Sequence, residues 1–313
     1  MRGGFADRLA TALACLLLAW SLLPAPALAA QSFVDDSGQT IAFERPFARI
    51  VSLYPAHAEV LIALGARDAL IAAGPSPVEG MDAAPLISYR DDPERILALA
   101  PDLVLVRPMI HDGYPHLIAR LKQFGIAVAS LQPGGAEELY EYWRRLGALC
   151  GRPERAEALV ADFAAELARL RGRAAAIPDQ QRPRVFFESI HRQFKTFSPD
   201  SLAIFALAAA GGVNAAADAR PVRDSAIAEY GHERILALAE GLDVYLAQVG
   251  TMNRVTAAEI AATPGFGALK AVRQGRVHLV DEALVSRPTP RLIEGARRIQ
   301  ALILPELAPE AGR

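Results

Sequence analysis

The chain has 313 residues, which is enough for two domains of ordinary size. Hydrophobic residues make up 52% of it and charged residues 22%, so a full core can form and a largely disordered chain is excluded. The formal net charge of -2 provides no basic field of the kind that attracts nucleic acids or anionic membranes, so we expect neither as a direct partner.

The N-terminus has the layout of a secretory signal peptide. Arg2 and Arg8 precede an apolar run over residues 9–23, and small residues follow as far as Ala30. The run is shorter than the roughly 20 residues that a membrane-spanning helix needs. We therefore expect a signal peptide over residues 1–29, cleavage after Ala29 or Ala30, and a periplasmic protein.

The two cysteines have different expected fates. Cys15 lies inside the apolar run, with Ala12 where a lipobox usually has Leu, so we do not expect lipidation. Cleavage would leave Cys150 alone, which excludes an intramolecular disulfide.

In the first half of the mature chain, short apolar runs alternate with segments of helical pattern. The expected strands are 50–53, 71–73, 103–106 and 126–131, and the expected helices are 58–64, 93–99 and 117–124. Asp92 followed by Pro93 is a typical helix start, with a capping side chain before a proline at the first position. Strands that alternate with helices predict an α/β domain with a parallel sheet.

The second half repeats this alternation after Pro183. The expected strands are 185–187, 243–247 and 275–280, and the expected helices are 202–207, 233–238 and 291–304. We expect the segment 198–200 (Ser-Pro-Asp) to cap the first of these helices and the glycine pair 211–212 to end it.

A long helical stretch separates the halves. After a helix over 137–149, the chain from Pro153 to about Ala176 contains one glycine and is rich in Ala, Leu, Arg and Glu. Its apolar residues recur at helical spacing. The predicted organisation is an N-terminal lobe over 30–152, a backbone helix over 153–176 and a C-terminal lobe over 177–313. A continuous helix is stiffer than a loop hinge, so we expect the lobes to move little on binding.

The order of these segments is similar to the class of periplasmic binding proteins with a helical backbone, which serves ferric siderophores, vitamin B12 and haem. The resembling motifs are RIVSLYPAHAEVLIALG (49–65), ERILALAPDLV (94–104), AGGVN (210–214), HERILAL (232–238), VRQGRV (272–277) and RPTPR (287–291). The resemblance implies two Rossmann-like α/β lobes with parallel sheets, joined by one long helix, with a ligand cleft between them. It also implies an ABC importer as partner, with a permease dimer and its ATPase, and membrane contact only through that permease. The implied ligand is a ferric siderophore or a corrinoid, with haem as the alternative.

Two acidic residues are candidates for docking onto the permease. Glu59 and Glu233 are each expected in the first turn of a helix, one per lobe. In the family, acidic residues at such places contact arginines of the permease. The helix dipole also favours a carboxylate in a first turn, which is the simpler interpretation. The matched positions in two lobes favour docking.

Ligand contacts are expected in the loops that follow strand ends, because such loops face the crevice of an open α/β sheet. The candidates are Tyr54, Tyr89, Arg90, Arg107, Met109 and His111 in the first lobe, and Phe194, Lys195, Gln248, Arg254, Arg287 and Arg291 in the second. Aromatic and cationic side chains suit a bulky chelate with apolar faces and anionic edges. Solvated surface charge is the plainer explanation for many of them, and we expect about half to miss the ligand.

Three alternatives remain open. Tyr89 followed by Arg90 partly matches the axial tyrosine and arginine of haem-binding members, which keeps haem as an alternative ligand. A bare metal ion needs three or four converging ligands, and of the six histidines only His111 and His116 are closely spaced. An α/β enzyme would need a dinucleotide fingerprint, a P-loop or a nucleophile elbow, and the sequence has none of these. We therefore expect no catalysis and no bound cofactor.

Overall fold

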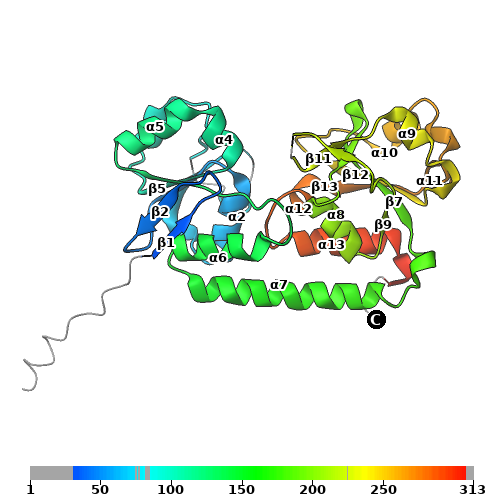
Figure 1. The fold of residues 1–313 in the computed structure, drawn as a ribbon, viewed down its shortest axis with the longest axis horizontal. Helices are drawn as coiled ribbons and strands as arrows, with labels where there is room; N and C mark the ends of the chain where they lie inside the picture. Colours follow the sequence, from blue (N-terminus) through cyan, green and yellow to red (C-terminus); the bar gives the residue numbers. More distant parts are fainter. Residues whose placement is uncertain (1–30, 75, 77, 82–84, 224, 308–313) are drawn as a thin grey trace, which may run out of the picture.

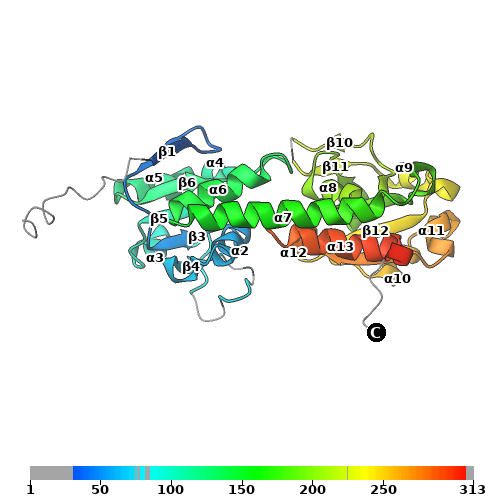
Figure 2. The ribbon, with the colours of Figure 1, turned by 90° about the horizontal axis from the view of Figure 1, so that it is seen from below.

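The computed structural model describes residues 31–74, 76, 78–81, 85–223 and 225–307. The predicted signal peptide lies outside the described residues. Two α/β lobes stand side by side, and helix α7 (Pro153–Ala174) runs along the base of both (Figures 1 and 2). The predicted helix over 153–176 is confirmed to within two residues.

The first lobe contains the parallel sheet that its alternating pattern predicts. Its strands are β4 (Leu70–Ala73), β3 (Ile50–Ser52), β5 (Leu103–Val106) and β6 (Ala127–Ser130), in that spatial order. Every residue of β3 and β5 is buried, which explains why these strands are continuous apolar runs in the sequence. The helices are α2 (Pro55–Ala63), α3 (Pro93–Leu97), α4 (Pro108–Gly113), α5 (Pro115–Gln123) and α6 (Leu139–Leu149). Asp92 caps α3 as predicted, since its carboxylate accepts a hydrogen bond from the backbone N–H of Glu94 at 3.1 Å.

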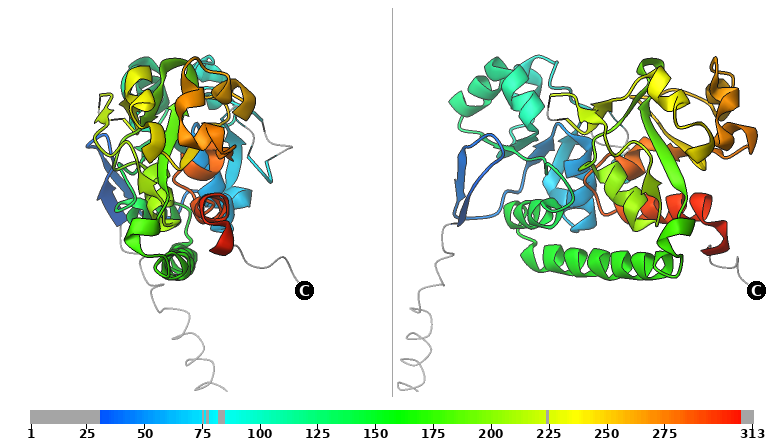
Figure 3. Two further views of the ribbon diagram at one scale, coloured as in Figure 1. Left: turned by 90° about the vertical axis from the view of Figure 1, so that its right-hand side faces the viewer. Right: turned by 45° about the vertical axis from the view of Figure 1, so that its right-hand side comes forward.

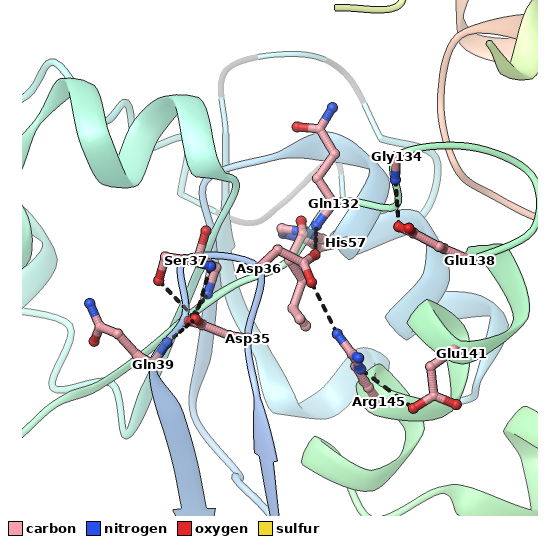
Figure 4. Close-up of polar contacts among 12 residues, drawn as sticks. Asp35, Asp36, Ser37, Gln39, His57, Gln132, Gly134, Glu138, Glu141 and Arg145 are labelled. Atoms are coloured by element: carbon pink, nitrogen blue, oxygen red, sulfur yellow. Dashed lines mark hydrogen bonds and ion pairs between the residues drawn. The ribbon is translucent and has the colours of Figure 1, made fainter. Parts of the chain in front are cut away.

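A hairpin of β1 (Gln31–Val34) and β2 (Thr40–Phe43), which the sequence did not predict, is attached to this lobe. The buried carboxylate of Asp35 accepts backbone N–H groups from its own turn and, at 2.9 Å, from Ser130 at the end of β6 (Figure 4). The neighbouring Asp36 accepts the N–H of Gln132 and pairs with Arg145 of α6 at 3.0 Å. These side-chain contacts hold the hairpin against the first lobe. The sequence did not predict the hairpin because strands of four residues are too short to show a clear hydrophobic period.

The second lobe contains the expected parallel strands, and antiparallel strands that the sequence did not predict extend them into a mixed sheet. Its spatial order is β10 (Arg220–Pro221), β11 (Ile227–Glu229), β8 (Lys195–Phe197), β7 (Arg184–Ile190), β12 (Val244–Val249) and β13 (Val277–Asp281), while β9 (Val213–Asn214) pairs with β7. The strands β7, β12 and β13 are parallel, and β8, β11 and β10 continue the sheet in antiparallel pairs. Only four residues separate β7 from β8, which allows a hairpin but not a parallel crossover.

The helices of the second lobe are short, apart from two. They are α8 (Leu202–Ala209), α9 (His232–Leu236), α10 (Ala257–Ala261), α11 (Lys270–Arg273), α12 (Glu282–Val285) and α13 (Leu292–Ile303). The cap of α8 is Ser201, whose hydroxyl accepts the N–H of Ile204, and not the segment 198–200 that we expected. Among the described residues no helix is both long enough and apolar enough to cross a membrane.

The two lobes share one hydrophobic core at their base, where α7 lies beside α13 in both views of Figure 3. Trp143 of α6 packs edge-on against Phe163 of α7, with ring centroids 5.1 Å apart. The indole N–H of Trp143 also donates to the carbonyl of Pro288, in the segment between α12 and α13, at 3.0 Å. A core that is continuous across the base supports the expectation of stiff lobes.

Candidate functional site

The predicted ligand residues that the structure brings together best lie where β3 and β5 end. The guanidinium of Arg107 stands over the ring of Tyr54, 4.9 Å from its centroid. The ring of Tyr54 meets the imidazole of His57 edge-on at 5.2 Å, and burial raises the pKa of the Tyr54 hydroxyl. His57 itself is fully buried, donates to the carbonyl of Leu131 at 2.7 Å, and has its pKa lowered by burial to about 4. Tyr54 and Arg107 therefore form a cation–π pair over a neutral histidine.

Arg287 joins this group from the second lobe. Its guanidinium forms an ion pair with the carboxylate of Glu59, and only 17% and 8% of the two side chains are exposed. Glu59 lies on the second turn of α2, not on the first as we expected. A buried carboxylate that is already paired with an arginine of its own chain does not fit docking on a permease. The docking role expected for Glu59 is therefore corrected.

Tyr89 and Arg90 form a second aromatic and cationic surface on the first lobe. The ring of Tyr89 packs against Tyr114 with centroids 4.8 Å apart, and the exposed Arg90 lies 5.4 Å from the Tyr89 centroid. Arg90 also donates to the Tyr114 hydroxyl at 3.3 Å. These contacts hold Arg90 on the rings while leaving it exposed to solvent. Met109, at the start of α4, is 46% exposed.

His111 is not available in the way we expected. The side-chain amide of Gln39 donates to its Nε2 at 2.8 Å, and its Nδ1 lies 3.0 Å from the carboxylate of Asp112. Both ring nitrogens are therefore occupied, one of them by the β1–β2 hairpin that the sequence did not predict.

In the second lobe, Phe194 lies at the tip of the β7–β8 hairpin. Its φ of 51° is a left-handed value that non-glycine residues rarely adopt. The half-buried ring packs against His232 with centroids 4.9 Å apart, and against Phe266. Lys195 pairs with Glu229 at 3.0 Å. Phe194 therefore belongs largely to the lobe's core, while Lys195 remains close to its surface.

The other candidates of the second lobe differ in accessibility. Gln248 is fully buried, donates to the carbonyl of Ser189 and accepts from the hydroxyl of Ser286, so its assignment as a ligand contact is corrected. Arg254 is exposed and lines a hollow of about 570 Å³. Arg291 lies 3.8 Å from the carboxylate of Glu294 at the start of α13.

A buried polar network behind the β7–β8 hairpin was missed by sequence reasoning. The carboxylate of Glu188, which is fully buried, accepts from the Tyr245 hydroxyl, from His191 Nδ1 at 2.9 Å and from the Asn253 amide at 3.4 Å. Asn253 also accepts the backbone N–H of His191 at 2.9 Å. The hydrogen bond to Glu188 raises the pKa of His191. A glutamate inside the apolar run 185–190 was the available signal for this network.

Glu233, the other residue expected to dock on a permease, is exposed to solvent. It lies in the first turn of α9, and 94% of its side chain is exposed. The hexapeptide ERILAL that begins at Glu233 occurs once more in the chain, beginning at Glu94 in the first turn of α3. Glu94 is 58% exposed and pairs with Arg120 at 2.7 Å. The counterpart of Glu233 in the first lobe is therefore Glu94 rather than Glu59.

Among the described residues, no three His, Cys, Asp or Glu side chains gather closely enough to hold a metal ion.

Comparison with known proteins identifies the class of the chain. An uncharacterized ABC transporter substrate-binding lipoprotein of Bacillus subtilis is 27% identical, over 88% of this chain and 86% of that protein. A cobalamin-binding protein of Halobacterium salinarum is 26% identical, over 95% of this chain and 84% of that protein. The solved structure of a periplasmic heme-binding protein from Roseiflexus sp. RS-1 in apo form is 26% identical and superposes with a TM-score of 0.69, over 83% of this chain and 99% of that one. The family model described as periplasmic binding protein matches residues 50–284, so the chain belongs to the periplasmic binding protein family, whose members bind solutes and are not enzymes.

Proposed function

We propose that the chain is the substrate-binding component of an ABC importer, which captures a metal chelate in the periplasm and delivers it to the permease. The observation that carries this proposal is the ion pair of Arg287, from the second lobe, with Glu59 of the first lobe, close enough to the Tyr54–Arg107 pair for both charges to act on the Tyr54 hydroxyl. A ligand placed there touches both lobes, as a two-lobed binding protein requires. Two relatives support the same function: one is named as an ABC transporter substrate-binding lipoprotein and the other as a cobalamin-binding protein.

The proposed ligand is a ferric siderophore or a corrinoid. Aromatic rings such as those of Tyr54 and Tyr89 offer flat apolar faces, and the neighbouring arginines offer hydrogen bonds at their edges. The proposed contacts are Tyr54, Tyr89, Arg90, Arg107, Met109, Arg254, Arg287 and Arg291, with Phe194 and Lys195 at the margin. Haem is the second candidate, favoured by Tyr89 beside Arg90 and by the likeness to the heme-binding protein.

The permease is proposed to contact Glu94 on α3 and Glu233 on α9. Both carboxylates are exposed, and each stands in the first turn of a short helix with the same sequence, one helix per lobe. Two separated charge contacts would orient the protein over the pore, and salt would weaken them. The proposal keeps a signal peptide over 1–29, lobes over 30–152 and 177–313, and a backbone helix over 153–176.

The proposed function is tested by titrating the purified mature protein with cyanocobalamin, haemin and a ferric hydroxamate siderophore. Trp143 lies in α6 beside the second-lobe segment that carries Arg287, so intrinsic fluorescence reports on the same region. We expect saturable binding of at least one chelate with a Kd of about 1 μM or tighter, equivalent to about 8 kcal/mol. The variant Arg107→Gln should weaken that binding. Arg298→Gln, which removes the same charge from an exposed side chain of α13, should not. Failure of all three chelates to bind would contradict the proposal.

A further inference from the structure

Several buried polar side chains lie where Arg287 of the second lobe contacts the first lobe. We call Tyr54, Glu59, Arg107, Arg287 and Thr289 the junction cluster. Arg107 stacks on Tyr54, Arg287 pairs with Glu59, and the charges of Glu59, Arg107 and Arg287 all act on the Tyr54 hydroxyl. Two arginines thus share a site with a single carboxylate.

Glu59 limits the hydrogen bonds that Arg287 can donate to a ligand. The guanidinium of Arg287 comes from the loop between α12 and α13, and the carboxylate that it meets is on α2, 228 residues earlier in the chain. A ligand carboxylate that approached Arg287 would have to displace Glu59 or remain beside it. Two carboxylates at hydrogen-bonding distance from one guanidinium repel each other strongly where water is scarce.

The remaining hydrogen-bonding capacity of the cluster is of mixed type. Among the described residues, Glu59 Oε2, Arg107 Nε and Thr289 Oγ1 are buried without a partner. The first accepts, the second donates and the third can do both. A carboxamide also donates and accepts, whereas a carboxylate only accepts. These atoms are buried in this structure, so a bound molecule reaches them only when the two lobes separate.

We infer that Glu59 is a specificity-determining residue, which occupies Arg287 and thereby selects chelates with neutral carboxamide arms over chelates with carboxylate arms. The inference rests on the proposed function and narrows it, because the arms of a corrinoid end in carboxamides whereas a carboxylate-rich siderophore and haem carry carboxylates. It also gives Glu59 a role inside the ligand site in place of the docking role that its burial contradicts.

The test compares ligands that differ only in this group. Cyanocobalamin and its isomeric monocarboxylic acids, each with one propionamide arm hydrolysed, are titrated against the mature protein by intrinsic fluorescence. We expect the wild type to bind cyanocobalamin at least about tenfold more tightly than one of the acids, equivalent to about 1.4 kcal/mol. Glu59→Gln keeps the shape of the side chain and leaves Arg287 without its carboxylate partner. In this variant the ratio of the two affinities should shift by about tenfold or more toward the acid.

Two further variants separate this effect from general electrostatics and from misfolding. Glu233→Gln removes the same charge from an exposed site, so it should leave the preference unchanged. Glu59→Gln/Arg287→Gln removes both buried charges, and its affinity for the acid should lie between those of the wild type and Glu59→Gln. Circular dichroism melting checks that each variant is folded.

The outcomes distinguish the inference from the function on which it rests. If the wild type binds the corrinoids but Glu59→Gln leaves the ratio of their affinities unchanged, the inference is wrong and the proposed function stands. The same holds if only haemin or a ferric siderophore binds to the wild type. If no chelate binds, both the inference and the proposed function are wrong.

Discussion

Removal of the Glu59 carboxylate should destabilise the whole molecule, because Arg287 would be left as a buried charge without a counter-charge. Both side chains are more than four-fifths buried, so solvent screens the pair only weakly. Breaking a buried ion pair by removing one partner typically costs about 3–5 kcal/mol. For Glu59→Ala we therefore expect a loss of about 3 kcal/mol in the free energy of unfolding. With an m-value of about 3 kcal/mol/M, the urea midpoint would fall by roughly 1 M.

The assay is urea unfolding followed by circular dichroism and by tryptophan fluorescence, with three comparison variants. Glu233→Ala removes an exposed first-turn carboxylate and should cost no more than about 1 kcal/mol. Arg287→Met should cost about as much as Glu59→Ala, since it leaves the opposite charge buried. Glu59→Met/Arg287→Met replaces the pair by apolar side chains and should be close to the wild type in stability. If Glu59→Ala costs no more than Glu233→Ala, the pair behaves as a hydrated surface contact and our description of the junction is wrong.

Three further predictions follow from other parts of the fold. The double variant Glu94→Ala/Glu233→Ala should bind ligand as tightly as the wild type. In liposomes that carry the importer, it should transport the ligand more slowly, and its transport rate should depend less on salt concentration. Weakened ligand binding would instead place these glutamates in the ligand site. The pKa of His191 is raised in the folded state, so its contribution to stability is complete below its unfolded pKa and is lost as pH rises through the folded pKa. His191→Gln should therefore flatten the curve of urea midpoint against pH on the alkaline side of about pH 6.5, and an unchanged curve would contradict this. Gly295→Ala should destabilise the protein by about 1–3 kcal/mol, because its Cβ would clash with the backbone carbonyl oxygen of Leu284 in α12. Gly172→Ala, in α7, meets nothing within 4 Å and should stabilise the protein by about 0.5–1 kcal/mol. Equal changes in melting temperature for the two variants, measured by calorimetry, would refute the packing argument.

Local patterns were sufficient for most of the regular elements. The run 103–106 was predicted as a buried strand because a strand covered on both faces is apolar at every position, and β5 is buried throughout. The start of α3 was predicted from Asp92 and Pro93, which act within one turn of the helix. The helix over 153–176 was recognisable because its apolar spacing persists over six turns. Each of these signals operates between residues that are near in sequence.

In the second lobe, the sequence did not predict the direction of every strand or which side chains are free to contact a ligand. The apolar run after Pro183 identifies β7, but nothing in its composition shows that β8 returns beside it in the antiparallel sense. Similarly, Gln248 follows the predicted strand 243–247 and was therefore expected to be available to a ligand. It lies within β12, where it accepts a hydrogen bond from Ser286 and donates one to Ser189. Position relative to a strand end indicates which loops face the site, but the packing of neighbouring loops decides which side chains remain free.

The sequence by itself determined the family, the two-lobed order of elements and the helix that joins the lobes. It also contained the repeated ERILAL segment, which marks Glu94 and Glu233 as equivalent positions. Only the tertiary structure decided that Glu59 pairs with Arg287, because these residues are 228 positions apart and lie in different lobes. Hydrophobic spacing encodes which face of an element is buried. It does not encode which two faces pack against each other, and that packing is what buried Glu59 and left Glu233 exposed.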